Sequence, residues 1–313
     1  RRTQTLSAHP EAADQFAKRE AAAESNGKGL SVDDLLSVLP NHQLDSALLP
    51  RGSHLQWLMA MVAGGLYLGA ILFFFPVARY FAKALLLTAL FTATVGVLML
   101  LAFQWIAFHT YGVNFGGLNA ITLFLFIAKF IGFSYRCAMD PSNGFAISFF
   151  GFTFGVGLCE ELTKALPLLA AIRRNDDPPG WNELLVRGLA SGIGFGIAEA
   201  ILYAGQYNGI QGVDTYLVRF FSCVLLHALW AAAVAITLFN RQDWLHNTES
   251  LWSYSLMLIP ILIIPMTLHG LYDTLLKQEH EGYALAVALA SFLYLVLQIE
   301  RMRRRDPDVA LAT

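Results

Sequence analysis

The sequence predicts an all-α polytopic membrane protein with about eight transmembrane helices and a polar N-terminal tail. Of its 313 residues, 56% are hydrophobic and only 14% are charged, whereas an ordinary soluble domain carries about a quarter charged residues. The apolar residues form long continuous runs, and a spanning helix needs about 20 of them at a rise of about 1.5 Å each. Membrane strands would instead alternate over about ten residues, so we predict helices rather than a barrel.

Eight runs meet this length requirement. Their predicted boundaries are residues 57–75, 84–108, 118–135, 145–172, 183–207, 215–239, 252–276 and 283–300. The sequence Pro178-Pro179-Gly180 marks a clear break between the fourth and fifth runs. We therefore expect an extramembrane tail at 1–55, a membrane domain at 56–300 and a basic C-terminal tail at 301–313.

The N-terminal tail contains two local helix signals. An Ala-, Glu- and Lys-rich stretch from Pro10 to Glu24 favours a helix, and Ser31 followed by Asp34 is typical of a capped short helix. Charged residues are frequent over the first 55 positions. We expect a flexible tail with short helices.

The basic residues between the apolar runs predict the orientation, because Lys and Arg accumulate in cytoplasmic connections. Eight crossings place both termini on one side. That side would hold Arg51, Arg241, the basic residues between the fourth and fifth runs and the Arg-rich end at 301–305. We therefore expect both termini to be cytoplasmic, with the lipid bilayer as the protein's surroundings.

Other function classes find no support in the composition. The formal net charge is −2 and no basic patch with interleaved aromatic residues occurs, so no nucleic acid partner is expected. Three cysteines, an odd number in apolar surroundings, do not make a disulfide framework. Cys159 adjoins Glu160, but an apolar setting disfavours the thiolate that a cysteine nucleophile needs.

Ionisable residues inside the apolar runs are the candidate functional groups, since each costs about 2.5–3.5 kcal/mol to insert. They occur in four consecutive runs. These residues are Glu160, Glu161 and Lys164 in the fourth run, Glu199 in the fifth, Arg219 and His227 in the sixth, and His269 and Asp273 in the seventh.

Their depths and spacings predict one shared site. Counted from the cytoplasmic helix ends, Glu160, Glu199, His227 and His269 lie about 18 to 25 Å along their helices, which is one layer. Lys164 shares a helix face with Glu160 and Glu161 and would neutralise one of the two carboxylates.

Two further spacings add supporting groups. Asp273 lies four residues after His269 and would orient its imidazole, and Arg219 shares a face with His227 as a peripheral counter-ion. Small residues recur every four positions from Gly188 through Gly192 and Gly196. Such a ridge permits close helix packing, which would bring the fourth and fifth helices, and hence Glu160 and Glu199, together.

Four ordered motifs carry a family resemblance. They are Glu-Glu-x-x-Lys at 160–164, Phe-Gly-x-x-Glu at 195–199, a lone His227 and His-x-x-x-Asp at 269–273. This set, over about residues 145–276, resembles the PrsW family of intramembrane proteases, which is related to the type II CAAX prenyl proteases and to a γ-secretase subunit. Glu199 stands where the CAAX branch has His, and Lys164 replaces a more distant Arg. Both differences favour PrsW.

The resemblance implies a peptidase that cuts a membrane-tethered, single-span protein such as an anti-sigma factor, in the bacterial inner membrane. The implied catalytic residues are Glu160, Glu161, Glu199, His227 and His269, with Lys164, Asp273 and Arg219 in support. Glu160 would deprotonate water, with Glu161 as the alternative base. His227 and His269 would donate protons to the oxyanion or to the leaving amine, and Glu199 would position the water.

The residues leave open whether a metal takes part. Two His and a carboxylate make a catalytic zinc set, but the sequence lacks His-Glu-x-x-His. We expect no cofactor, with Zn²⁺ as the alternative, held by His227, His269, Glu160 and Glu199.

Two other functions also remain open, a proton-coupled transporter and a non-catalytic scaffold that binds a membrane helix. The absence of repeat symmetry between the two halves disfavours the transporter. The adjacent buried carboxylates Glu160 and Glu161 disfavour the scaffold.

Overall fold

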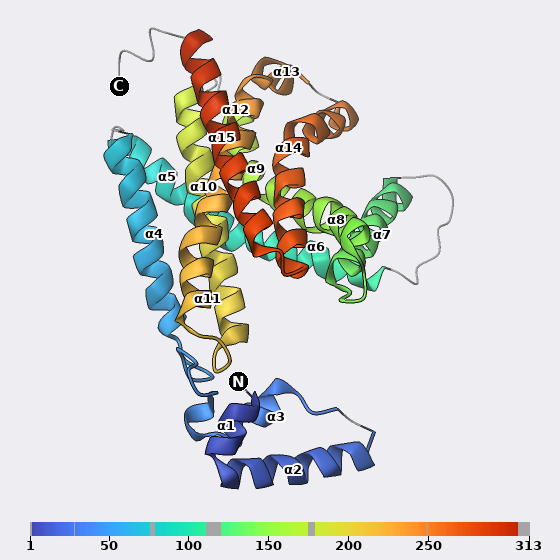
Figure 1. Cartoon of the computed structure of the whole chain (residues 1–313). Coiled ribbons are helices and arrows are strands. Elements are labelled where there is room, and N and C mark those ends of the chain that lie inside the picture. The colour runs from blue at the N-terminus through green and yellow to red at the C-terminus, as the bar shows by residue number, and fades with distance from the viewer. Residues whose placement is uncertain are drawn as a thin grey trace. The chain divides into compact units, whose positions relative to one another are not determined.

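The computed structural model describes residues 2–27, 29–75, 79–110, 120–174, 179–248 and 250–305. Within these ranges the chain is almost entirely helical and contains no strand, as Figure 1 shows. Pro178 and the C-terminal end beyond 305 lie outside the described residues.

The predicted order of eight long apolar helices is confirmed. Eight described segments are long and apolar enough to cross a membrane: Leu55–Phe74 (α4), Phe81–His109 (in α5, Arg79–Phe91, and α6, Val97–His109), Ile121–Met139 (in α7, Ala120–Met139), Phe145–Arg174 (α8, Phe145–Gly151, and α9, Leu158–Arg174), Trp181–Tyr207 (α10), Val213–Phe239 (α11, Val213–Leu217, and α12, Val224–Phe239), Ser255–Lys277 (in α14, Leu251–Lys277) and Glu281–Arg305 (α15). Most of their ends differ from the predicted ends by only a few residues. A short helix, α13 (Gln242–Asn247), precedes α14.

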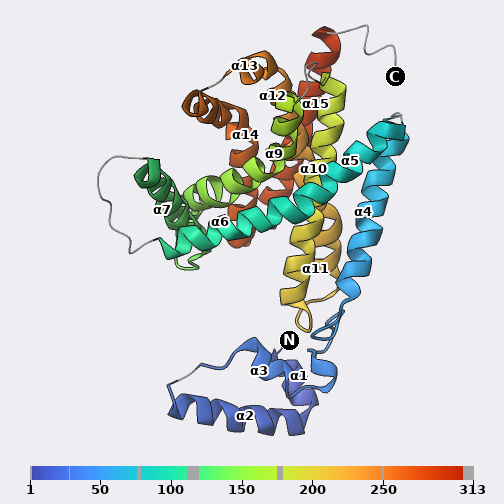
Figure 2. The same cartoon turned by 180° about the vertical axis from the view of Figure 1, so that it is seen from behind.

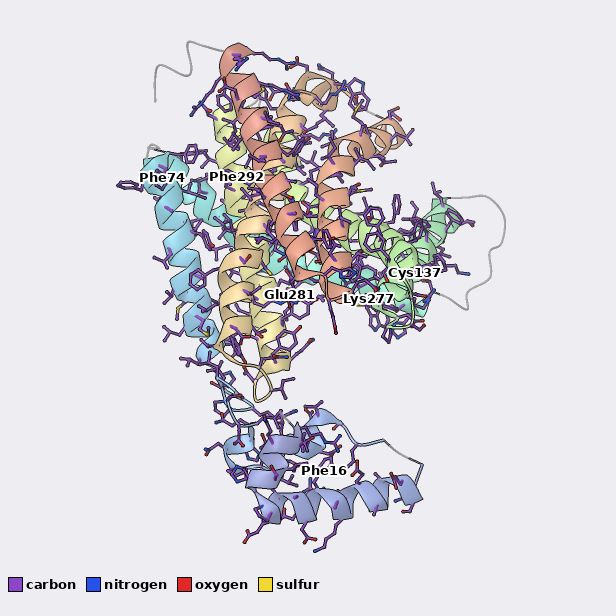
Figure 3. The ribbon with its side chains drawn as sticks, in the orientation of Figure 1. Phe16, Phe74, Cys137, Lys277, Glu281 and Phe292 are labelled. Atoms are coloured by element: carbon purple, nitrogen blue, oxygen red, sulfur yellow. The ribbon has the colours of Figure 1, made fainter. Side chains whose placement is uncertain are left out.

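Apolar side chains on the outer faces of these helices fit a lipid environment. Phe74 on α4 and Phe292 on α15 are 73% and 49% exposed, and Figure 3 shows Phe74 at the outer edge of its helix. Large exposed apolar surfaces on a soluble monomer are unusual. The helical backbone satisfies its own hydrogen bonds, as a chain in lipid requires.

The chain forms two compact units. Arg1–Gly65 with Glu199–Cys223 makes the first unit, and Leu66–Ala198 with Val224–Thr313 makes the second. The assignment of residues 56–300 as one protease domain stays a prediction.

The N-terminal segment of the first unit is folded rather than a bare flexible tail. It contains α1 (Arg2–Ala8), α2 (Pro10–Ser25) and α3 (Val32–Leu36), and both predicted helix signals are confirmed. The Ser31 side chain accepts from the backbone N–H of Asp34, whose carboxylate accepts from the N–H of Ser31. The helices share a small apolar core, which consists of Ala12, Phe16, Leu35, Leu36, Leu39 and Leu44; Figure 3 labels Phe16.

In the second unit, glycines set the closest helix approaches. A Cβ atom added to Gly188, Gly192 or Gly196 would lie 2.7, 2.2 or 2.8 Å from backbone atoms of α12. The fourth and fifth spans do meet, since the Ser191 hydroxyl on α10 donates to the carbonyl oxygen of Lys164 on α9 at 2.7 Å, but the predicted ridge itself packs against the sixth span. The physical reason is that α12 offers matching small residues, Ala228 and Ala231, at the contact.

The fourth span uses its own glycines against other helices. A Cβ added to Gly157, in the π-helical turn Phe152–Gly157, would lie 2.7 Å from the carbonyl oxygen of Met266 on α14. One added to Gly270 on α14 would lie 2.4 Å from Oγ1 of Thr153. These paired contacts hold α14 against the helix that carries Glu160 and Glu161.

One lysine joins three helix ends on one side of the second unit. The ammonium group of Lys277 at the end of α14 donates to the carbonyl oxygens of Ala138 and Asp140, at 2.8 and 2.6 Å, and to the Ser148 hydroxyl at 2.8 Å. Figure 3 shows Lys277 beside Cys137 on α7. The connection between the third and fourth spans is thereby tied to the end of the seventh.

We predict opposite effects for alanine at two glycines of α10. Gly192→Ala should destabilise the protein by about 1–3 kcal/mol, because the added methyl group overlaps the backbone of His227. Gly205→Ala is the matched control, since a Cβ there meets nothing within 4 Å and alanine favours a helix. Thermal unfolding in detergent measures both. An unfolding midpoint for Gly192→Ala at or above that of Gly205→Ala would contradict the packing.

Candidate active site

Three helices of the second unit bring five ionisable side chains together. The helix α9 supplies Glu160, Glu161 and Lys164, α12 supplies His227 and α14 supplies His269. Each of these five residues is 7% exposed or less. The sequence prediction that the fourth, sixth and seventh spans share one polar layer is consistent with this arrangement.

Lys164 occupies the centre of the cluster and is fully buried. Its ammonium group donates to Oε1 of Glu161 at 2.6 Å and lies 2.9 Å from Nδ1 of His227. It also lies over the rings of Phe195 and Trp230, at 4.9 and 5.6 Å from their centroids. The carboxylate and the two ring faces together compensate a charge that has lost its water.

His269 is held by carboxylates on both sides of its ring. Its Nδ1 lies 2.9 Å from Oε1 of Glu161, and its Nε2 lies 3.6 Å from Oε2 of Glu160 and 3.4 Å from Oδ2 of Asp273. Glu161 therefore makes the closest contact with this ring. The prediction that Asp273 orients His269 has geometric support, but Glu161 is the nearer partner.

The cluster could hold a metal ion. Ligand atoms of Glu160, His227 and His269 lie within 4.8 Å of one another, and all three residues are buried. One carboxylate and two imidazoles are the donor set of a catalytic zinc site with an open position. Glu161 on Nδ1 of His269 is also the kind of outer contact that directs the opposite ring nitrogen toward a metal. The residues present therefore fit zinc.

Two aromatic residues also line the site: Trp230, which the sequence analysis did not identify, and Phe195, which it named only as part of the Phe-Gly-x-x-Glu motif. Trp230 stacks on His269, with ring centroids 4.4 Å apart and planes at 18°. Phe195 lies 5.1 Å from the His227 ring, centroid to centroid. The available signal for Trp230 was its spacing, since it comes three residues after His227 and shares its helix face.

Two predicted residues, Glu199 and Arg219, belong to the first unit. There they form an ion pair at 3.6 Å, and the guanidinium of Arg219 lies 4.1 Å from the centroid of the Tyr203 ring. The roles predicted for Glu199, positioning the water or binding zinc, stay predictions.

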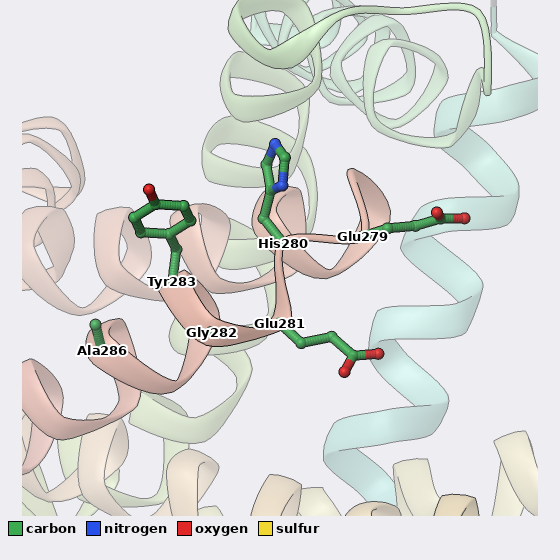
Figure 4. Close-up of a pocket in the computed structure, with 6 residues that line it drawn as sticks. All are labelled: Glu279, His280, Glu281, Gly282, Tyr283 and Ala286. Carbon is green, nitrogen blue, oxygen red and sulfur yellow. The ribbon is translucent and has the colours of Figure 1, made fainter.

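A surface hollow elsewhere in the second unit contains none of the predicted site residues. Figure 4 shows it at the turn between α14 and α15. Its lining consists of Glu279, His280, Glu281, Gly282, Tyr283 and Ala286. The polar cluster, rather than this hollow, is the candidate active site.

The chain matches the model of a known protein family. The model of the family described as PrsW family intramembrane metalloprotease matches residues 79–299, which is more than half of the chain. The matched range includes every residue that the sequence predicted for the site. Searches of curated proteins and of solved structures give no match.

We predict that Lys164 and Glu161 stabilise the fold only as a pair. Lys164→Met should cost about 3–5 kcal/mol, because it leaves the fully buried Glu161 carboxylate without its cation. The double variant Lys164→Met, Glu161→Gln should recover much of that loss. Unfolding of both variants and of Glu161→Gln alone gives the coupling free energy. A loss of stability in the double variant equal to the sum of the losses in the two single variants would contradict a coupled pair.

Proposed function

Because the chain belongs to the PrsW family of intramembrane metalloproteases, we propose that the cluster around Glu160, His227 and His269 hydrolyses a peptide bond of a membrane-tethered protein. The observation that carries this proposal is the convergence of three buried ligating side chains, from three helices, within 4.8 Å. Burying such groups is costly in lipid. A site of this composition can activate water and stabilise the charge that develops on a peptide oxygen.

We favour the metal-bound form of this site, in agreement with the family description. Glu160, His227 and His269 would hold the zinc ion, which when bound supplies Lewis acidity and lowers the pKa of water. Glu161 would accept from Nδ1 of His269 and keep its other ring nitrogen directed inward. Lys164 would compensate the charge of Glu161 and fix its position.

Glu161 is also the carboxylate best placed to act as the base in this form. Its Oε1 is engaged by Lys164 and His269, whereas its Oε2 is buried with no hydrogen-bond partner among the described residues. Such an oxygen can take a proton from an attacking water molecule. The adjacent pair Glu160 and Glu161 would thus divide ligation and proton transfer between them.

A metal-free glutamic mechanism is the second candidate, and one contact favours it. If the Lys164 ammonium donates to Nδ1 of His227, the neutral imidazole carries its proton on Nε2. An Nε2–H group can donate to an oxyanion but cannot bind a metal. In this form Glu160 deprotonates the water, and His227 and His269 act as donors.

The family membership supports a membrane protein as the substrate. An intramembrane protease acts on a membrane protein within the lipid bilayer. The family resemblance supports a substrate with a single span, such as an anti-sigma factor, and a bacterial inner membrane as the location. A regulated cleavage of that kind would release the tethered protein.

We expect Glu160→Gln and His269→Ala to lower cleavage by on the order of 100-fold or more, with the purified proteins still folded. The assay measures cleavage of single-span membrane proteins in liposomes. Glu300→Gln, on the exposed end of α15, is the control and should keep the wild-type rate. Wild-type cleavage by Glu160→Gln would exclude this site. Failure of the wild type to cleave any substrate would favour the transporter or the scaffold.

Elemental analysis separates the two mechanisms. We expect about one zinc ion per chain, lost in His227→Ala and kept in Glu300→Gln, because His227 belongs to the donor set. Chelation should remove the metal and the activity together, and added zinc should restore both. Full activity with no bound metal would establish the glutamic mechanism instead.

A further inference from the structure

We infer that the N-terminal helical region, residues 2–54, lies on the extracytoplasmic side of the membrane. If all eight segments crossed in turn, the start of the first span and the connection between the fifth and sixth spans would lie on opposite sides. The contacts within each unit contradict that alternation independently. The inference does not depend on the proteolytic function.

In the first unit, the start of the first span is bound to the connection between the fifth and sixth spans. The backbone N–H of Gly209 donates to the carbonyl oxygen of Leu49 at 2.8 Å, and the N–H of Leu48 donates to that of Gln211 at 2.9 Å. The Asn208 side chain donates to the carbonyl oxygen of Ser53 at 2.9 Å. Groups joined by direct hydrogen bonds lie on the same side of a bilayer whose apolar core is about 30 Å thick.

Further contacts extend this docking into the N-terminal core. The N–H of Leu44 donates to the carbonyl oxygen of Gly209 at 2.7 Å, and Ile210 packs against the cluster that contains Phe16 and Leu36. Gly209 adopts a φ of +88°, and a Cβ there would lie 2.8 Å from the carbonyl oxygen of His42. The N-terminal region and this connection therefore form one folded body.

In the second unit, the end of the first span and the start of the second span lie at the start of the fifth span. The guanidinium of Arg187, early in α10, stacks over the Phe81 ring at 5.2 Å. Further along, the Thr92 and Ser191 hydroxyls are 2.8 Å apart. Ile71, near the end of α4, shares a hydrophobic cluster with Val186. Strict alternation would again separate these ends by the whole bilayer.

Both contact sets lead to the same crossing count. Phe81–His109 and Ile121–Met139 must together make one net crossing, so that the fourth span starts on the extracytoplasmic side. Figures 1 and 2 show α5 and α6 running obliquely across α9, α14 and α15, a course that suits an incomplete crossing. The chain then makes about seven net crossings.

The distribution of basic residues agrees with this arrangement. In this arrangement, Arg79 and Lys83, near the start of the second span, lie on the cytoplasmic side. The same side holds Arg241, the pair Arg173 and Arg174, and the arginine-rich end of α15. Short cytoplasmic connections are rich in Lys and Arg. The N-terminal region is long and carries both positive and negative residues, so its charge does not prevent it from lying on the extracytoplasmic side.

Cysteine labelling tests the inference. We would label single variants Ser25→Cys, Asp214→Cys, Asp243→Cys and Arg303→Cys with a membrane-impermeant maleimide, in sealed right-side-out and inverted vesicles. Wild type gives the background, because its three cysteines are buried. Ser25→Cys and Asp214→Cys should react in right-side-out vesicles, and Asp243→Cys and Arg303→Cys only in inverted ones. Reaction of Ser25→Cys together with Arg303→Cys would overturn the inference.

A disulfide trap tests the docking itself, without any assay of activity. Leu48→Cys with Gln211→Cys should cross-link on mild oxidation, since their backbones are hydrogen-bonded in the first unit. The control pair, Leu48→Cys with Asp243→Cys, lies on opposite sides in this arrangement and should not. Failure of the first pair to link, in protein that unfolds like wild type, would also overturn the inference.

Discussion

The contact between Lys164 and Glu161 is the interaction on which the rest of the site depends. Both residues are fully buried, and their charged atoms are 2.6 Å apart. Neither charge would be tolerable alone at membrane depth. Once paired, they fix two further groups, because Lys164 contacts His227 and Glu161 contacts His269. One charge pair thus determines the positions of both imidazoles relative to Glu160.

Close helix packing makes this pairing possible. Gly192 lets α12 approach until the carbonyl of His227 meets the α10 backbone, and Gly157 and Gly270 do the same for α14 against the fourth span. The π-helical turn Phe152–Gly157 immediately precedes the helix that carries Glu160, and such turns are frequent at functional sites. Small residues therefore bring the polar groups into contact, and larger ones, such as Trp230, enclose them.

The long apolar helices and most residues of the polar cluster could be predicted because both can be recognised directly from the order of residues along the chain. Length and hydropathy define a span, and the cost of burial makes Glu160, Lys164 and His269 conspicuous. Helix partners carry no such signal. The ridge at Gly192 could have faced any neighbour, and its match with α12 depends on alanines that belong to another helix. Trp230 was not predicted because aromatic residues are common in apolar runs.

The side on which each segment lies is the property least determined by the sequence. Apolar length is necessary for a crossing but does not ensure one, because an oblique or partly buried helix satisfies the same composition. When the side of each connection is assigned by counting spans, errors accumulate. One segment that does not cross the bilayer reverses the assigned side of every connection on one side of it in the sequence. Contacts do not accumulate error in this way. The hydrogen bonds between Gly209 and Leu49, and the stacking of Arg187 on Phe81, each fix two ends on one side regardless of what the chain does between them.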